Sequence, residues 1–415
     1  MASVDLRTRT DAGITPVDAG EFFGRDLPAL IDAHAHLAVP GARQLSPKPF
    51  AIEVDGHAWT LSLTDDGLTV TAGADGAAAV AVLDAEELTD LVHDVRTPMG
   101  FFTGGDLDMP QGRLNDFLDW WVVLRSLLDQ RPVHTTGAID FRDARGEPLA
   151  LDHTFKPDDD RDDMSHFLAQ AGFLHIGGLF TEDEMNTISA DMDAAMPSYV
   201  PDDGRSWWAK TSNGDNRLVR MEYFHEHSET TRHLLGDERF LNLANLTDDG
   251  HRFGELHTGW NMIEALVKPL GIVEGISDLP WHKDCSLGRH SYRCCSLTVG
   301  ISVTGADADT GQLRVVAGSH RALVQPAPFV RRDLDLPQVD LPTQTGDVTV
   351  HLSCTLHMSQ APVTAERRVM YTGFRLPDVE GTDSEAAKAN EKKIGRIREG
   401  AYKTVSQVPS PAVRT

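Results

Sequence analysis

The sequence has few cysteines, fewer basic than acidic residues, and no long apolar run. No Cys-x-x-Cys pair occurs among its four cysteines, which are Cys285, Cys294, Cys295 and Cys354. In a chain of 415 residues this excludes a disulfide framework, and the spacing does not suit a structural zinc site. A reducing, cytoplasmic compartment is therefore expected.

The shortage of lysine and arginine leaves a formal net charge of −25. Such a field repels phosphate backbones and anionic membranes, so we expect no nucleic-acid partner. The first residues carry charges where a signal peptide needs an apolar stretch, and no run is long enough to span a bilayer. We expect a soluble protein of two or three domains with a small-molecule substrate, and leave a homodimer open.

What is present begins with a small α+β domain over residues 46–135, preceded by a separate helical segment, residues 1–45. Alternating apolar runs are separated by turns of the kind that joins hairpin strands. These turns are Asp55-Gly56, Asp66-Gly67 and Asp75-Gly76. Asp84 and Glu87 form a capping-box pattern at the start of a helix, and residues 113–128 keep the spacing of a second helix.

Residues 50–129 resemble the sterol-carrier-protein type of lipid-binding domain. The resemblance lies in the strand meander, in residues 84–91 and in the Pro-Met-Gly-Phe-Phe-Thr-Gly-Gly-Asp-Leu run within residues 97–107. Members of that family enclose an apolar tunnel, so the resemblance implies an acyl or sterol-like ligand. A docking or dimerisation module on the same fold is an equally open alternative, because fold does not fix function.

The second half of the chain has the pattern of a β-sandwich or barrel. Residues 136–163 are polar and acidic and are expected to form a linker. Residues 164–380 contain short apolar strands separated by glycine-bearing turns, which predicts a sandwich or barrel. Residues 381–415 are expected to form one helix and a Ser/Pro-rich tail.

Three residues in this half have the character of a metal site. His282 and Asp284 alternate at a strand end, so both side chains point to one face. His357 follows a later strand, which a closed barrel can bring opposite the first pair. Two imidazoles and one carboxylate are the ligands that non-heme Fe(II) uses when three positions must stay open. Arg368 offers a guanidinium for the far carboxylate of a bidentate co-substrate.

The same half resembles the phytanoyl-CoA dioxygenase family of Fe(II)/2-oxoglutarate oxygenases, which share a double-stranded β-helix. Five blocks carry the resemblance in the family's order: residues 280–284, 311–321, 346–347, 356–359 and 367–374. It implies that His282, Asp284 and His357 bind iron, that Arg368 pairs with the C5 carboxylate of 2-oxoglutarate, and that Ser359 donates a hydrogen bond to that carboxylate.

The resemblance also implies Fe(II), 2-oxoglutarate and O2 as cofactors and co-substrates, with ascorbate as an optional reductant in vitro. Related halogenating enzymes replace the carboxylate ligand with Ala or Gly, whereas Asp284 retains it. We therefore predict hydroxylation of an unactivated C–H bond, or else desaturation or ring closure. The expected substrate is small and hydrophobic, acyl-linked or natural-product-like.

Several alternatives stay open. His351 competes with His357 for the distal ligand position, but it stands where the family resembled has an aromatic, which favours a packed histidine. Arg367 competes with Arg368, and strand alternation puts the two on opposite faces, with the family resemblance favouring Arg368. Four residues near the His-x-Asp pair are candidates for substrate contact: Trp281, Lys268, Arg289 and Tyr292.

Other functions were weighed on different residues. Asp32, His34 and His36 have the His-x-His pattern of amidohydrolases, but that fold needs a long βα-barrel after it. A lipid-binding protein with an inactive oxygenase domain is one alternative, and the intact set of His282, Asp284 and His357 argues against it. A metal-dependent isomerase or hydrolase on the same barrel is another, and it would not need Arg368.

Overall fold

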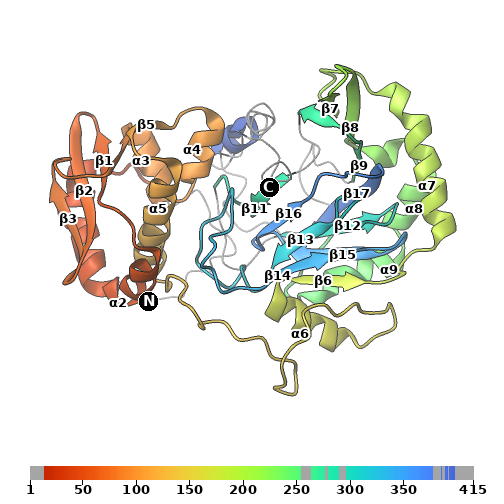
Figure 1. The fold of residues 1–415 in the computed structure, drawn as a ribbon, viewed down its shortest axis with the longest axis horizontal. Helices are drawn as coiled ribbons and strands as arrows, with labels where there is room; N and C mark the ends of the chain where they lie inside the picture. Colours follow the sequence, from red (N-terminus) through yellow and green to blue (C-terminus); the bar gives the residue numbers. More distant parts are fainter. Residues whose placement is uncertain are drawn as a thin grey trace.

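The computed structural model describes residues 14–253, 263–275, 279–288, 296–376, 385, 388–390 and 392–397. They form a small amino-terminal body beside a larger, β-rich body (Figure 1). In the part of the chain described, no helix combines the length and the apolar character that crossing a membrane requires.

The amino-terminal body is a five-stranded sheet covered by helices. Its strands follow the order β3-β2-β1-β4-β5, with β1 parallel to β4 and the other neighbours antiparallel. The strands are β1 (Phe50–Val54), β2 (His57–Thr64), β3 (Gly67–Ala72), β4 (Ala79–Leu83) and β5 (Asp108–Gln111). The main helices are α2 (Leu27–Leu45), α3 (Ala85–Val92), α4 (Pro98–Gly104) and α5 (Leu114–Asp129), after a short turn of α1 (Ala19–Glu21) and η2 (Phe22–Asp26).

Local sequence signals account for these boundaries. Asp55 and Gly56 both have positive φ, the conformation that a tight turn between twisted strands requires. The Asp84 carboxylate accepts a hydrogen bond from the Glu87 backbone N–H at 2.7 Å, and the Glu87 carboxylate accepts from the Asp84 N–H at 2.9 Å. The predicted capping box at the start of α3 is confirmed.

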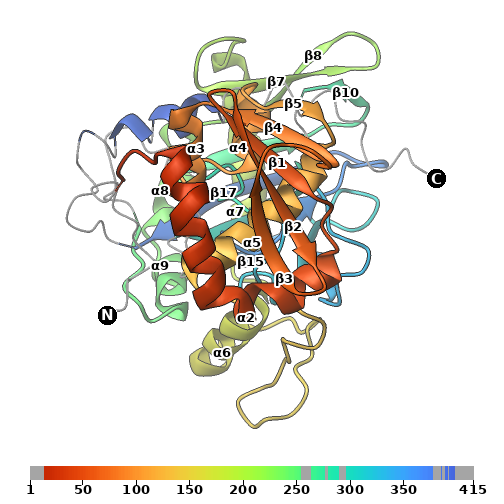
Figure 2. The ribbon, with the colours of Figure 1, turned by 90° about the vertical axis from the view of Figure 1, so that its left-hand side faces the viewer.

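Helix α2 belongs to the same hydrophobic core as the sheet, although the sequence set residues 1–45 apart. Leu27, Ala38 and Ala42 are fully buried, and the Phe23 ring stacks on Trp59 of β2 at a centroid distance of 4.9 Å. Periodicity identified the helix, but its partner is decided by tertiary packing. Figure 2 views this body face-on, with α2 and the sheet in front of the larger body.

The larger body contains two sheets. The eight-stranded sheet has the order β10-β7-β8-β9-β17-β12-β15-β6, and the four-stranded sheet has the order β11-β16-β13-β14. The strands of the larger sheet are β6 (Phe173–Ile176), β7 (Ser206–Thr211), β8 (Asn216–Met221), β9 (Glu264–Lys268), β10 (Ile272–Glu274), β12 (Ser296–Ser302), β15 (Val348–Leu352) and β17 (Arg367–Arg375). Those of the smaller sheet are β11 (Leu279–His282), β13 (Leu313–Val316), β14 (Gln338–Leu341) and β16 (His357–Ser359).

Helices cover the outer side of the larger sheet (Figure 1). They are α6 (Arg161–Ala171), α7 (Glu182–Ala195), α8 (Glu229–Leu235) and α9 (Glu238–Leu241), with short 3-10 turns at Met196–Ser198, Phe224–Glu226 and Asn242–Leu246. Ile188 of α7, Leu234 of α8 and Phe374 of β17 belong to one buried cluster between the helices and the sheet. The other side of the larger sheet faces the four-stranded sheet, as expected for a jelly roll.

Candidate metal centre

The predicted iron ligands meet on the four-stranded sheet. Strands β11 and β16 are antiparallel, and their register pairs His282 directly with His357. Asp284 follows two residues after His282, in the turn that leaves β11. Its backbone N–H donates to the Ser353 carbonyl at 2.8 Å, which ties this turn to the loop after β15.

The three side chains converge on one point. One ligand atom from each of His282, Asp284 and His357 lies within 4.8 Å of the other two. The Asp284 Oδ1 atom is 3.8 Å from His282 Nε2 and 3.6 Å from His357 Nε2. Within the described ranges this is the one group of three such residues close enough to hold a metal ion, and Asp32, His34 and His36 of α2 form no comparable cluster.

Hydrogen bonds hold both imidazoles in the orientation that a metal ligand needs. His282 Nδ1 lies 2.7 Å from the Pro280 carbonyl oxygen, and His357 Nδ1 lies 2.9 Å from the Thr355 carbonyl oxygen. A carbonyl only accepts, so each Nδ1 carries the proton and each Nε2 presents a free lone pair to the centre. Thr298 donates to Asp284 Oδ2 at 3.0 Å, which leaves Oδ1 for the metal. This donor set fits Fe(II).

Burial keeps the ligands in their metal-binding protonation states. Desolvation, together with neighbouring imidazoles, lowers the pKa of His282 and of His357 from 6.5 to about 4. Burial alone would raise the pKa of the Asp284 carboxyl, but His357, His351 and His282 around it hold that pKa below its usual range. Near neutral pH the site therefore offers two neutral imidazoles and one carboxylate.

Lowering the pH from 7 to 5 is expected to destabilise the metal-free protein. His320 and His351, like the two ligand histidines, have their pKa lowered from 6.5 to about 4, in each case mainly by burial. Between these two values the unfolded chain binds more protons than the folded one, so stability falls as the pH falls. Each imidazole contributes up to about 1.4 kcal/mol per pH unit in that window. Urea unfolding at pH 7, 6 and 5 measures this, and a constant midpoint would contradict it.

His351 is a third imidazole beside the triad. It lies on β15, is 1% exposed, and its Nε2 atom is 4.0 Å from Asp284 Oδ2. Its ring packs on that of His357 at a centroid distance of 4.3 Å. Neither ring nitrogen has a hydrogen-bond partner in the described part of the chain. His351 therefore faces the outer oxygen of the carboxylate, while His357 is the histidine that groups with His282 and Asp284 as a possible ligand.

His351→Phe is expected to stabilise the metal-free protein by about 1 kcal/mol, because two unsatisfied buried nitrogens are replaced by an apolar ring of similar shape. Urea unfolding of the metal-free variant measures this gain, and titration with Fe(II) under anaerobic conditions measures metal affinity, which should stay within about threefold of wild type, well below the loss typical of an orienting partner. A large loss of Fe(II) affinity would instead make His351 part of the metal site.

The two competing arginines lie on opposite faces of β17. Arg368 points to the helical layer, where it donates to the Ser189 carbonyl at 2.9 Å and forms ion pairs with Asp193 at 2.7 Å and Glu366 at 3.1 Å. Arg367 points inward and is 3% exposed. The structure thus does not bring Arg368 to the triad, because strand alternation turns its side chain to the helical layer, and it is Arg367 whose side chain lies on the inner face.

Arg367, Lys268 and Ser359 form a buried cationic cluster next to the triad. Arg367 and Lys268 are direct neighbours across β17 and β9, and each is 3% exposed. Lys268 Nζ hydrogen-bonds Ser359 Oγ, and Arg367 Nη1 lies 3.5 Å from the same oxygen. Ser359 shares a face of β16 with His357, two residues away.

This cluster has the character of a carboxylate-binding site. In the described part of the chain no acidic side chain forms an ion pair with Arg367, and its buried Nε atom has no hydrogen-bond partner. A buried guanidinium is stable only when its donors are satisfied, and its fork matches a carboxylate. Lys268, predicted to contact substrate, lies at this end of the site instead.

The other residues predicted to contact the substrate are Trp281, Arg289 and Tyr292. Trp281 precedes His282 on β11 and therefore faces the opposite way, packing on the cluster formed by Val316 and Leu356. Arg289 and Tyr292 lie outside the described residues. The sequence held a signal for the inward orientation of Arg367. Met370 and Phe374 share a strand face with Arg368, and their large apolar side chains suit a surface covered by helices, which leaves Arg367 on the opposite, inner face.

A jelly roll that brings two histidines and one aspartate together is typical of the class of non-heme metal proteins. Within that class, residues 168–370 match the family model described as Phytanoyl-CoA dioxygenase (PhyH). The matched segment contains His282, Asp284, His357 and Arg367.

Solved structures similar to the chain include EctD from S. alaskensis with 2-oxoglutarate and 5-hydroxyectoine, at 16% identity over 59% of this chain and 86% of that chain, with a TM-score of 0.43. The non-heme alpha ketoglutarate dependent epimerase SnoN from nogalamycin biosynthesis is 18% identical over 52% of this chain and 83% of that chain, with a TM-score of 0.42. AviO1 from Streptomyces viridochromogenes Tue57 is 22% identical over 52% and 96%, with a TM-score of 0.39. No curated protein matches the chain.

Proposed function

We propose that this protein is an Fe(II)- and 2-oxoglutarate-dependent dioxygenase that hydroxylates an unactivated C–H bond of a small hydrophobic, acyl-linked or natural-product-like substrate. The observation that carries the proposal is the pairing of two sites on β16. His357, with His282 and Asp284, offers a facial set of metal ligands, and Ser359 lies two residues further, beside two buried cations. A metal-dependent hydrolase, or an isomerase that uses no 2-oxoglutarate, has no use for the second site.

In this proposal His282, Asp284 and His357 hold Fe(II), and Arg367, Lys268 and Ser359 hold the far carboxylate of 2-oxoglutarate. When bound, iron with 2-oxoglutarate and O2 supplies the oxidising power for hydrogen abstraction, with release of succinate and CO2. Thr298 keeps Asp284 oriented through its outer oxygen, and the carbonyls of Pro280 and Thr355 keep the imidazoles oriented.

The type of reaction follows from the carboxylate ligand. Asp284 fills the position that halogenating relatives leave open for halide, which favours hydroxylation, desaturation or ring closure. No acidic or basic side chain of the described residues is required for the chemistry beyond these two sites, so substrate shape and orientation decide the outcome.

The amino-terminal body supports a further part of the proposal, that it is a sterol-carrier-like domain. The first three strands form the predicted antiparallel meander, whereas β4 departs from it by pairing in parallel with β1, and helices cover the sheet. A lipid-binding protein with an inactive oxygenase half is the alternative, and the complete ligand set argues against it. If the body presents a lipid-like substrate, acyl chains in solution should compete with turnover.

One experiment tests the proposed function. Fe(II) and then 2-oxoglutarate are added under anaerobic conditions, and the visible charge-transfer band of the chelate is sought. Air is then admitted and succinate is measured. The proposal expects both signals from the full chain, with uncoupled succinate formation in the absence of substrate. A protein that binds Fe(II) but shows neither band nor succinate is not a 2-oxoglutarate oxygenase.

A further inference from the structure

The turn that follows the ligand Asp284 is enclosed by the amino-terminal body. Thr97, the N-cap of α4, donates its backbone N–H to the Leu287 carbonyl at 3.0 Å. Its hydroxyl donates to the Ser286 carbonyl at 2.5 Å and also caps α4 by accepting from the Gly100 N–H at 3.2 Å. One buried side chain therefore ends a helix of one body and fixes the metal-site turn of the other.

The two backbones approach so closely that only glycine fits on either side. A Cβ atom at Gly100 would stand 2.2 Å from the Leu287 carbonyl oxygen. A Cβ atom at Gly288 would stand 2.0 Å from the Val95 carbonyl oxygen, and Gly288 has a φ of +157°. Real Cβ atoms essentially never come so near to a backbone oxygen, so a side chain at either position forces the bodies apart.

The contacting segment of the amino-terminal body is rigid because two buried arginines hold it. Arg125 of α5, 1% exposed, donates to the Val92 carbonyl at 2.8 Å and pairs with the fully buried Asp94 at 3.7 Å. Arg96 pairs with Asp90 at 2.6 Å and with Asp106 at 2.8 Å. Residues 92–97 are thus cross-linked to α3, to α5 and to the loop after α4 before they reach the other body.

The jelly roll holds the same turn from its far side. Lys283 donates its backbone N–H to the Pro326 carbonyl at 2.9 Å and its ammonium to the Ser319 carbonyl at 2.9 Å. Asp284 is bound through its N–H to Ser353. Residues 283–288 are therefore clamped between the two bodies, and the metal ligand lies inside the clamped segment.

The interface around the clamp combines apolar packing with buried polar contacts, which argues against a swinging domain. Met99 and Leu118 pack with Ala327 in one cluster, and Leu323 is buried in the core of the amino-terminal body itself. Gln325 of the loop after β13 donates to Asp119 of α5 at 2.5 Å.

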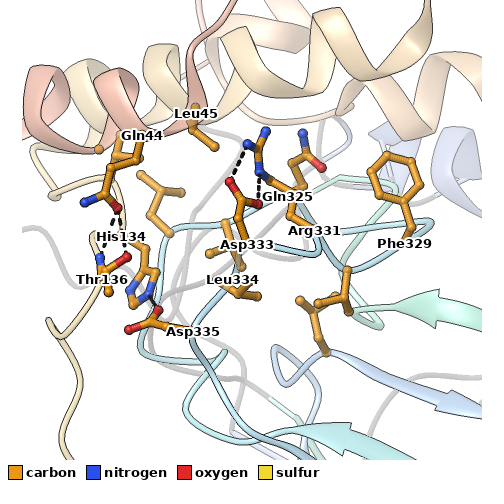
Figure 3. A pocket seen from close by; sticks show the side chains of 16 residues that line it. Gln44, Leu45, His134, Thr136, Gln325, Phe329, Arg331, Asp333, Leu334 and Asp335 are labelled. Atoms are coloured by element: carbon orange, nitrogen blue, oxygen red, sulfur yellow. Dashed lines mark hydrogen bonds and ion pairs between the residues drawn. The ribbon is translucent and has the colours of Figure 1, made fainter.

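The remaining gap in this interface is small. Figure 3 shows it between the end of α2 and residues 323–335, bordered by the ion pairs His134–Asp335 and Arg331–Asp333. Its volume is about 50 Å³, too little for a substrate of the proposed class, since sites for such ligands measure roughly 300–1,000 Å³. We therefore assign it to imperfect packing between the bodies.

We propose that the amino-terminal body is a built-in part of the metal centre: Thr97 and Gly100 act as positioning residues that hold the turn 284–288, and with it Asp284, in the geometry that binds the metal. The identity of the metal as iron rests on the proposed function. The amino-terminal body then cannot leave the oxygenase half to fetch substrate without loosening the metal site.

The test uses the full chain and compares Thr97→Val and Gly100→Ala with two controls. Thr97→Ser keeps the hydroxyl, and Gly24→Ala adds a methyl group where no atom lies within 4 Å. Co(II), added alone without 2-oxoglutarate, probes the site through its visible spectrum and its dissociation constant. Hydrogen exchange of the amides of residues 285–288 reports the turn without any metal.

Thr97→Val and Gly100→Ala are expected to weaken Co(II) binding roughly tenfold, to alter the Co(II) spectrum and to accelerate exchange at residues 285–288, as loss of an orienting partner does. Thr97→Ser and Gly24→Ala should match wild type. Alanine favours a helix over glycine, so a loss in Gly100→Ala cannot come from helix propensity. Thermal unfolding checks that each variant folds. If Gly100→Ala does not fold, Thr97→Val alone provides the test.

Two results would overturn the inference: unchanged exchange in both variants, or faster exchange with unchanged Co(II) affinity and spectrum. A wild-type protein that binds Co(II) but forms no 2-oxoglutarate chelate contradicts the proposed function alone, and the variants still decide whether the amino-terminal body positions the metal ligand.

Discussion

His357→Ala is expected to abolish turnover and to weaken Fe(II) binding by more than about 100-fold. Loss of an outer-shell partner alone costs roughly 10- to 100-fold in metal affinity, and this variant removes a ligand. His282 and Asp284, two residues apart on one segment, cannot complete a facial site by themselves. Anaerobic Fe(II) titration, the chelate band and succinate release measure the effect.

His351→Phe is the matched control, because it removes a buried imidazole whose ring packs on His357. If the proposed assignment of His357 as the distal ligand is right, the two variants separate sharply in Fe(II) affinity. Equal losses, or a larger loss in His351→Phe, would move the distal ligand from β16 to β15. Urea unfolding of both metal-free variants shows whether a loss of Fe(II) affinity comes from a new cavity that destabilises the fold or from the missing ligand itself.

Arg367→Ala is expected to raise the KM for 2-oxoglutarate about 100-fold, because charge-assisted hydrogen bonds are worth about 1.5–3 kcal/mol. With 2-oxoglutarate in excess, the rate should recover much of its wild-type value, since the guanidinium holds the carboxylate that does not react. The KM of Arg367→Lys should lie between those of wild type and Arg367→Ala, because an ammonium keeps the charge but cannot form the two parallel hydrogen bonds of a guanidinium. Steady-state kinetics over a wide range of 2-oxoglutarate concentration measure this.

Arg368→Ala is the neighbouring control and should leave that KM within about twofold. Its guanidinium pairs with Asp193, whose side chain is 61% exposed, so the lost ion pair is worth at most about 1 kcal/mol of stability. If Arg368→Ala raised this KM strongly while Arg367→Ala stayed near wild type, Arg368 would be the residue that binds the carboxylate, as the family resemblance implies. The buried cationic cluster would then have no part in the proposed function.

Much of the fold could be predicted from local signals. The turn Asp55-Gly56 and the capping box that begins at Asp84 occur where the sequence placed them, because each depends on residues within four positions. The presence of several short strands in the second half was also expected, since alternation is a property of neighbouring residues, although only some of the strands were located.

The parts that could not be predicted depend on contacts between distant residues. The partner of α2, the packing of Lys268 on Ser359 and the burial of Leu323 in the other body are all of this kind. Arg367 and Arg368 are adjacent and lie on opposite faces of β17. The family resemblance assigns carboxylate binding to Arg368 by a count of residues from His357, whereas Arg367 is the one whose side chain faces inward. A single missing residue in the preceding loop reverses such a count.

By itself, the sequence determined the donor set: two histidines and an aspartate, in the order and spacing that suit a facial metal site. Ligand chemistry depends on residue type, and residue type is written in the chain. The tertiary structure alone decided which arginine faces the site, that His351 stands beside the carboxylate, and that Thr97 of the amino-terminal body closes on the turn after Asp284. These features depend on which face of a strand a residue occupies and on contacts between distant residues, such as the hydrogen bond from the Thr97 hydroxyl to the Ser286 carbonyl across 189 residues of sequence. No local pattern encodes such contacts.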